Sequence, residues 1–165
     1  ELELMEGLDA MISICDSINY ITTPSDLIEV FKGVKAYLKN QGIFIFDFNS
    51  THYYRDELGE QVIAEDREDI SFIWDNYYDE DTCINEYILS LFIKEEDNLY
   101  RKYVEEHHQR SYTLSDIIDA LKASALTYVA SYDAFTRNAV HENSTRIYVI
   151  ARNDFKGEKT CQITL

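Results

Sequence analysis

Two short, nearly continuous apolar runs flank a segment with helical periodicity, and this arrangement constrains the fold most. The runs cover residues 8–15 and 43–48. Between them, Thr23 offers a capping hydroxyl and Pro24 a first helical residue, and apolar side chains then recur every three or four positions. A parallel strand that helices cover on both faces is continuously apolar. We therefore predict one right-handed βαβ unit over residues 8–49, with a helix from about residue 24 to 39.

The pattern changes at residue 70, where long aromatic-rich runs alternate with polar turns. Their bounds are 70–78, 84–94 and 99–109. Such spacing predicts an antiparallel meander over residues 70–109, inserted between α/β elements. Residues 113–153 return to the first pattern: a capped helix begins near Thr113, and two final strands follow at 127–135 and 145–152.

Charge and cysteine spacing exclude several classes of partner. The formal net charge is −16 and the basic residues are scattered, so we expect no nucleic-acid partner. No stretch approaches the roughly 20 apolar residues of a membrane helix, so we expect no membrane partner and a cytoplasmic protein. Cys15, Cys83 and Cys161 are widely spaced and lack a CxxC pattern, which indicates reduced thiols and no metal site.

The glycines argue against a nucleotide loop within these residues. There are only five in the 165-residue chain, and no two are close enough to form a phosphate-binding turn. The first residue is Glu rather than Met, from which we expect a fragment or a processed product.

The order of the predicted elements resembles the second half of the class I S-adenosylmethionine-dependent methyltransferase fold, from its fourth strand to its seventh. Residues 8–20 (LDAMISICDSINY) resemble the buried strand that ends in a polar turn at the cofactor. Residues 42–49 (GIFIFDFN) resemble the fifth strand, and residues 108–113 resemble the segment that leads into the last helix. The likeness covers residues 8–153 and is greatest to bacterial small-molecule methyltransferases. We therefore expect an α/β fold in which residues 1–165 form a single partial domain: the second half of a Rossmann-like methyltransferase sheet with an inserted antiparallel β meander.

This resemblance implies S-adenosyl-L-methionine as the cofactor and a small molecule as the methyl acceptor. It also implies that the half with the glycine-rich loop and the ribose-binding acid is missing, so that these residues alone are inactive. The alternative is a non-catalytic protein-interaction module derived from the same fold. If these 165 residues are all that is present, the outer edge of strand 10–15 lacks a neighbour, which predicts a homodimer through that edge.

Polar side chains at the carboxyl ends of the two parallel strands are the candidate site, because ligands of open α/β sheets bind at that edge. The resemblance implies cofactor contacts by Cys15, Asp16 and Ser17. It implies acceptor contacts by Asn19, Tyr20, Asp47, Asn49, His108 and Arg110. For Asp16, Ser17 and Asn19 the alternative is a turn whose side chains bind local backbone amides. For Asp47 and Asn49 the alternative is a solvated strand end.

Methyl transfer mainly requires alignment, because a sulfonium is already a strong electrophile, and we therefore assign no catalytic residue. His107, His108 and Arg110 close the meander and either orient an acidic acceptor or face water. The aromatic residues of the meander either form a lid over a substrate or pair across strands, and we favour pairing.

Overall fold

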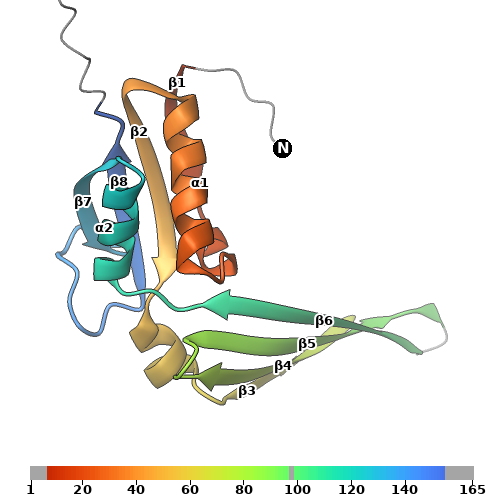
Figure 1. The fold of residues 1–165 in the computed structure, drawn as a ribbon. Coiled ribbons are helices and arrows are strands. Elements are labelled where there is room, and N and C mark those ends of the chain that lie inside the picture. Colours follow the sequence, from red (N-terminus) through yellow and green to blue (C-terminus); the bar gives the residue numbers. More distant parts are fainter. Residues whose placement is uncertain (1–6, 97–98, 155–165) are drawn as a thin grey trace, which may run out of the picture.

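A computed structural model describes residues 7–96 and 99–154, and in it the chain forms two four-stranded sheets arranged as an L (Figure 1). Cys161, the C-terminal tail and part of the turn expected at 95–98 lie outside the described residues. Cys15 and Cys83 are free thiols. No helix in the described part of the chain is long and apolar enough to cross a membrane.

The first sheet has the strand order β1-β2-β8-β7. Strand β1 (Leu8–Ser13) runs parallel to β2 (Leu38–Asn49), as the βαβ pattern predicts. Strand β8 (Arg146–Arg152) is antiparallel to β2, and β7 (Thr127–Asp133) completes the sheet. Strand β1 is therefore an edge strand among the described residues, and the predicted α/β class is confirmed.

Helices α1 (Pro24–Tyr37) and α2 (Leu114–Ala123) lie on the same face of this sheet (Figure 1). Thr23 and Thr113 cap them through their hydroxyl oxygens, as predicted. Phenylalanine side chains fill the space beneath α1, where the ring centroid of Phe31 lies 5.3 Å from that of Phe46.

Helices on both faces of β1 were expected, but the described helices cover one face only. Ile12 on the other face is 67% exposed. The chain contributes no further helix to that face within the described residues, so the apolar run there remains open to solvent.

Helix α1 ends earlier than predicted, because β2 already begins at Leu38. Leu8 pairs with Leu38 while Ala10 pairs with Ile43, so β2 carries a bulge opposite β1. A Cβ at Gly42 would lie 2.9 Å from the carbonyl oxygen of Leu8. This glycine therefore serves the close approach of two strands rather than the end of a helix.

The second sheet is the predicted meander, with one additional strand. Strands β4 (Ile70–Asp79), β5 (Ile84–Lys94) and β6 (Tyr100–Arg110) are antiparallel neighbours. Strand β3 (Val62–Asp66) precedes them. The sequence pattern did not predict it, because the strand has only five residues and about half of them are polar. The insertion therefore begins near residue 62 and not at residue 70.

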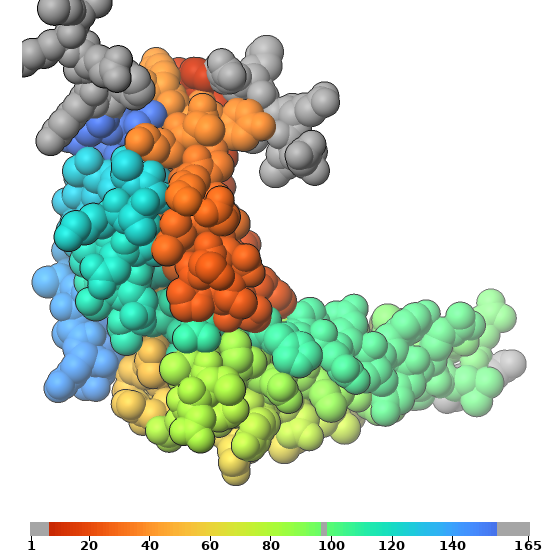
Figure 2. Space-filling model, viewed as in Figure 1, coloured from red at the N-terminus to blue at the C-terminus, as the bar shows by residue number. Residues whose placement is uncertain are grey.

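Two single-turn helices stand at the corner of the L. A 3₁₀ helix, η1 (Ser17–Tyr20), follows β1, and a π-helix, η2 (Tyr53–Leu58), follows β2. The hydroxyls of Tyr78 and Ser111 lie 2.8 Å apart and join the meander to the chain that leads into α2. Figure 2 shows an open hollow between the β1–α1 part of the molecule and the arm formed by the meander.

Candidate functional site

The turn after β1 has a strained backbone. Cys15 and Asp16 both lie in the left-handed region, with φ of 60° and 51°. The backbone N–H of Asp16 donates to Oδ1 of Asp47 over 3.1 Å, and the Ser17 hydroxyl donates to the carbonyl of Ile14 over 2.7 Å. Two consecutive left-handed residues without glycine persist only where their surroundings hold them, and here the end of β2 does so.

Arg146 joins the carboxylate of Asp16, in this turn, to that of Asp47 near the end of β2. Its Nη2 donates to Asp16 Oδ1 over 3.0 Å, and its Nη1 donates to Asp47 Oδ2 over 2.8 Å. Burial lowers the pKa of Arg146, but Asp16 and Asp47 raise it by more, so the net shift is upward. Asp47 is only 2% exposed, and the guanidinium supplies the partner that a buried carboxylate needs.

Arg146 is a site residue that the sequence prediction missed. It occupies an alternating position at the start of β8, directly opposite Asn49 on β2. One signal in the sequence could have found it. Arg146 lies on the half-buried face of a strand, and an acid, Asp47, stands near the end of another strand.

Gln109 extends this network into the meander and was also missed. Its Nε2 donates to Asp16 Oδ2 over 2.8 Å, and its Oε1 accepts from the hydroxyl of Tyr54 over 3.0 Å. Tyr54 is fully buried, and this burial raises its pKa far above 10, so the hydroxyl stays protonated and donates. Asn49 completes the chain of contacts by donating to the same hydroxyl over 3.4 Å.

Asn19 lies at the same edge but is fully buried. Its Nδ2 donates to the carbonyls of Asn49 and Arg110 over 3.0 and 2.8 Å, and its Oδ1 accepts from the Asn49 N–H over 2.8 Å. The side chain therefore binds the ends of β2 and β6 together. Its predicted role in acceptor binding stays a prediction, but its position is inside the protein and not on a solvated turn.

Tyr20 belongs to an aromatic cluster on the meander. Its hydroxyl lies 2.9 Å from the Tyr87 hydroxyl and 2.9 Å from Nδ1 of His107. The ring of Tyr87 stacks on that of His107 at 4.4 Å, and Trp74 approaches Tyr87 edge-on at 5.5 Å. Burial raises the pKa of Tyr87, and the hydrogen bond with Tyr20 and the charge of Asp16 raise it further.

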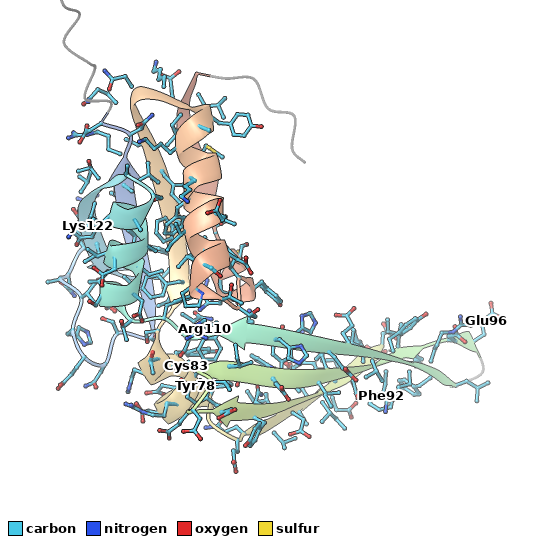
Figure 3. All side chains as sticks on the ribbon, viewed as in Figure 1. Tyr78, Cys83, Phe92, Glu96, Arg110 and Lys122 are labelled. Atoms are coloured by element: carbon cyan, nitrogen blue, oxygen red, sulfur yellow. The ribbon has the colours of Figure 1, made fainter. Side chains whose placement is uncertain are left out.

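His108 and Arg110 do not join this cluster. His108 lies near Glu86, with 3.6 Å between Nε2 and Oε1, and Arg110 donates to the carbonyl of Thr82 over 3.0 Å. Successive side chains of a strand point to opposite faces, so these two residues lie across β6 from His107. Figure 3 shows Arg110 where β6 meets the first sheet. Their assignment to the acceptor stays a prediction, but the expected grouping with His107 is not formed.

The chemistry of this edge fits a cationic ligand such as the sulfonium of S-adenosylmethionine. Asp16 and Asp47 carry two negative charges against the single positive charge of Arg146, which leaves one net negative charge. Ile14, which is 58% exposed, and the exposed Cys15 provide adjacent apolar surface. The cofactor contact expected of Cys15 stays a prediction.

Comparison with known sequences identifies two curated relatives, while no family model matches the chain. "Putative methyltransferase YqeM" of Bacillus subtilis (strain 168) is 30% identical over 152 residues, which are 92% of this chain and 59% of the relative. "Putative methyltransferase GWCH70_2453" of Geobacillus sp. (strain WCH70) is 28% identical over 152 residues, 92% of this chain and 62% of the relative. The chain thus spans about three fifths of the length of each relative.

Solved structures give the same result. An S-adenosylmethionine-dependent methyltransferase from Clostridium acetobutylicum ATCC 824 has a TM-score of 0.84 and 28% identity, with 92% of this chain and 61% of that chain aligned. The CcbJ methyltransferase from Streptomyces caelestis has a TM-score of 0.77 at 12% identity, with 92% and 60% aligned, and shows the fold alone. The prediction of a partial Rossmann-like methyltransferase fold is therefore confirmed.

Proposed function

We propose that this chain, which is class I S-adenosylmethionine-dependent methyltransferase-like in sequence and fold, forms the acceptor side of the active site of a longer enzyme. That enzyme transfers a methyl group from S-adenosylmethionine to a small molecule. The observation that carries the proposal is the strained Cys15–Asp16 turn, which Arg146 and Asp47 hold at the carboxyl ends of β1 and β2. Ligands of open α/β sheets bind at this edge.

The residues of the turn would hold one side of the cofactor, which supplies an electrophilic methyl group when bound. Cys15 and Ser17 are exposed to solvent, while the carboxylate of Asp16 supplies negative charge. The partners for the rest of the cofactor belong to a segment with a glycine-rich loop, which these 165 residues do not contain. The meander would then cover the acceptor and exclude water. We place this enzyme in the cytoplasm, where thiols such as Cys15 and Cys83 remain reduced.

Cofactor titration by calorimetry tests the proposal. A longer protein that extends upstream to the length of the curated relatives should bind S-adenosylmethionine at least about tenfold more tightly than residues 1–165 alone. Asp16→Ala in that protein should reduce methyl transfer, and Asp81→Ala, in an exposed turn of the meander, serves as the matched control. Equal binding by the two lengths would show that the cofactor site is misplaced.

A second candidate is a non-catalytic module that pairs with a copy of itself. The observation in its favour is the unpaired outer edge of β1 in the described part of the chain, next to exposed Ile12 and Ile14. An apolar edge strand is a template for pairing with another chain. Light scattering on residues 1–165 should then give a dimer, with slow amide hydrogen exchange at residues 10–15. A monomer with fast exchange there would rule out this pairing.

A further inference from the structure

Three side chains near the proposed site form a line of proton donors and acceptors. They are Tyr20, His107 and Glu105, and His107 lies between the other two. Its Nδ1 is 2.9 Å from the Tyr20 hydroxyl, and its Nε2 is 3.3 Å from Oε2 of Glu105 on the same face of β6. Gln109, two residues further along the same face, binds Asp16 of the strained turn. Alternate residues of a strand are about 7 Å apart, so this line lies close beside the turn.

The carboxylate fixes the direction of every hydrogen bond in the line. A carboxylate oxygen accepts, so in the neutral imidazole of His107 the hydrogen lies on Nε2 and Nδ1 is the acceptor. Tyr20 therefore donates to Nδ1, and Tyr87, whose raised pKa keeps it protonated, donates to the Tyr20 oxygen. In acyl-transfer enzymes the order carboxylate, imidazole, hydroxyl lets the imidazole take the proton of the hydroxyl as a general base, and the same direction of proton transfer is available here from Tyr20 to His107.

The charges around Tyr20 favour a cation. Asp16, Asp47 and Glu105 carry three negative charges against one positive charge on Arg146. The rings of Tyr20, Tyr87 and Trp74 add faces that attract cations. The imidazole of His108 and the cationic Arg110 would suit an acidic acceptor, but they lie on the opposite face of β6, where Arg110 donates to the carbonyls of Thr22 and Thr82.

We propose that the methyl acceptor is an amine and that Tyr20, His107 and Glu105 form the relay that removes its ammonium proton. The inference rests on the proposed function, because it names the class of acceptor for that same site. An N–H bond of the ammonium breaks and its proton passes to the Tyr20 oxygen, while the hydroxyl proton of Tyr20 passes to Nδ1 of His107. The electron pair stays on the amine nitrogen, and the positive charge moves to an imidazolium beside Glu105.

Tyr20 is the catalytic residue of this relay, since it would touch the acceptor and is 45% exposed. His107 and Glu105 act through it as positioning residues. An alkylammonium is a weaker acid than an imidazolium, so the proton transfer is uphill. It precedes the attack on the methyl group, because the ammonium nitrogen has no free electron pair until its proton has left. The titratable groups that face His107 are Tyr20 from η1, Tyr87 from β5 and Glu105 from its own strand, with Asp16 acting on Tyr87.

The 165-residue chain itself provides the test, because Trp74 is its single tryptophan and a direct fluorescence probe of the cluster. We would titrate it with 2-phenylethylamine, the neutral 2-phenylethanol and the anionic 3-phenylpropionate. Long-range ¹H–¹⁵N spectra of histidine-labelled protein would report the tautomer of His107. We expect the Nε2–H tautomer, and an affinity for the amine at least about tenfold above that for the alcohol and the acid.

Variants separate a relay from a structural cluster. Tyr20→Phe should abolish the response of His107 Nδ1 to the amine, and Glu105→Gln should shift the tautomer balance. Tyr77→Phe, at a 54% exposed site on the opposite face of the meander from His107, is the matched control and should change neither signal.

An Nδ1–H tautomer, or equal affinity for amine and alcohol, would overturn the inference. Neither measurement uses the cofactor or methyl transfer, so the two proposals can fail separately. A longer protein that methylates only alcohols or acids would support the proposed function and contradict the proposal that the acceptor is an amine. A longer protein that methylates nothing, together with intact amine recognition here, would refute methyl transfer and leave only an amine-binding site.

Discussion

The two sheets have the same number of strands but bury very different surfaces. The first packs one face against α1 and α2, and Phe31, Phe46 and Val149 at the centre of that face are inaccessible to solvent. The meander has only a small buried cluster of Tyr54, Leu58 and Tyr78, which lies at its base. Its outer part extends away from the first sheet (Figure 1), and most side chains there are half-exposed or exposed.

This difference places most of the apolar core in the first region, and we propose that the second region contacts the ligand. Buried polar side chains gather between them, where Asn19, Asp47 and Gln109 are almost inaccessible to solvent. A fully satisfied buried polar network specifies one geometry, whereas apolar surfaces slide more easily. The junction therefore sets the position of the meander relative to the strained turn.

The largest expected effect is on the apolar core of the first sheet. Phe46→Ala removes a ring that packs against Phe31 and Phe44, and should lower the free energy of unfolding by about 3–5 kcal/mol. Phe72→Ala in the half-exposed meander should lower it by only about 1 kcal/mol. Urea denaturation followed by circular dichroism measures both. Equal losses of unfolding free energy would contradict the conclusion that the first sheet holds most of the stabilising core and the meander little of it.

Removal of Arg146 should break the junction. Arg146→Met leaves the buried carboxylate of Asp47 without its cationic partner, and should cost about 2–4 kcal/mol of unfolding free energy. Arg146→Lys should recover only part of this loss, because an ammonium cannot bridge two carboxylates as a guanidinium does. Arg137→Met, at an exposed position, is the control. If Arg146→Met left the free energy of unfolding unchanged, another group would have to act as the partner of the Asp47 carboxylate.

Asn19→Ala should weaken the same junction by a comparable amount. The change removes three hydrogen bonds to the backbone at the ends of β2 and β6, worth about 1 kcal/mol each. Ser17→Ala, which removes one exposed hydrogen bond in the same turn, should cost about 0.5 kcal/mol. Thermal melts of both variants would compare them. A melting temperature unchanged by Asn19→Ala would return this residue to the ligand-binding role predicted from the sequence.

The smallest effect concerns alkaline pH. Burial raises the pKa of Tyr112 to about 12 from 10.0, so the folded state holds a proton that the unfolded state loses between these values. The stability from this group is complete below pH 10 and declines as the pH rises towards 12, by about 1 kcal/mol at pH 11. Tyr112→Phe should flatten this decline in urea titrations at pH 9 to 11. Tyr100→Phe, at a 47% exposed position in the meander, should leave it unchanged.

The sequence by itself determined the local elements of this protein. Apolar runs, capping threonines and polar turns define the βαβ unit, α2 and the long strands of the meander, because these signals act between residues that are near each other in the chain. The same reasoning places Asp16 and Asp47 at one edge, since parallel strands end together. The resemblance to class I methyltransferases rests on that order of elements.

Only the tertiary structure decided which side chains meet. Arg146 reaches Asp16 across 130 residues, and Gln109 reaches it across 93. The register of β6 places His107 beside Tyr20 and sends His108 and Arg110 to the other face. A shift of one residue in strand pairing would exchange those faces, and no local pattern specifies that register. The contacts of the site therefore depend on long-range pairing, which a single sequence does not reveal.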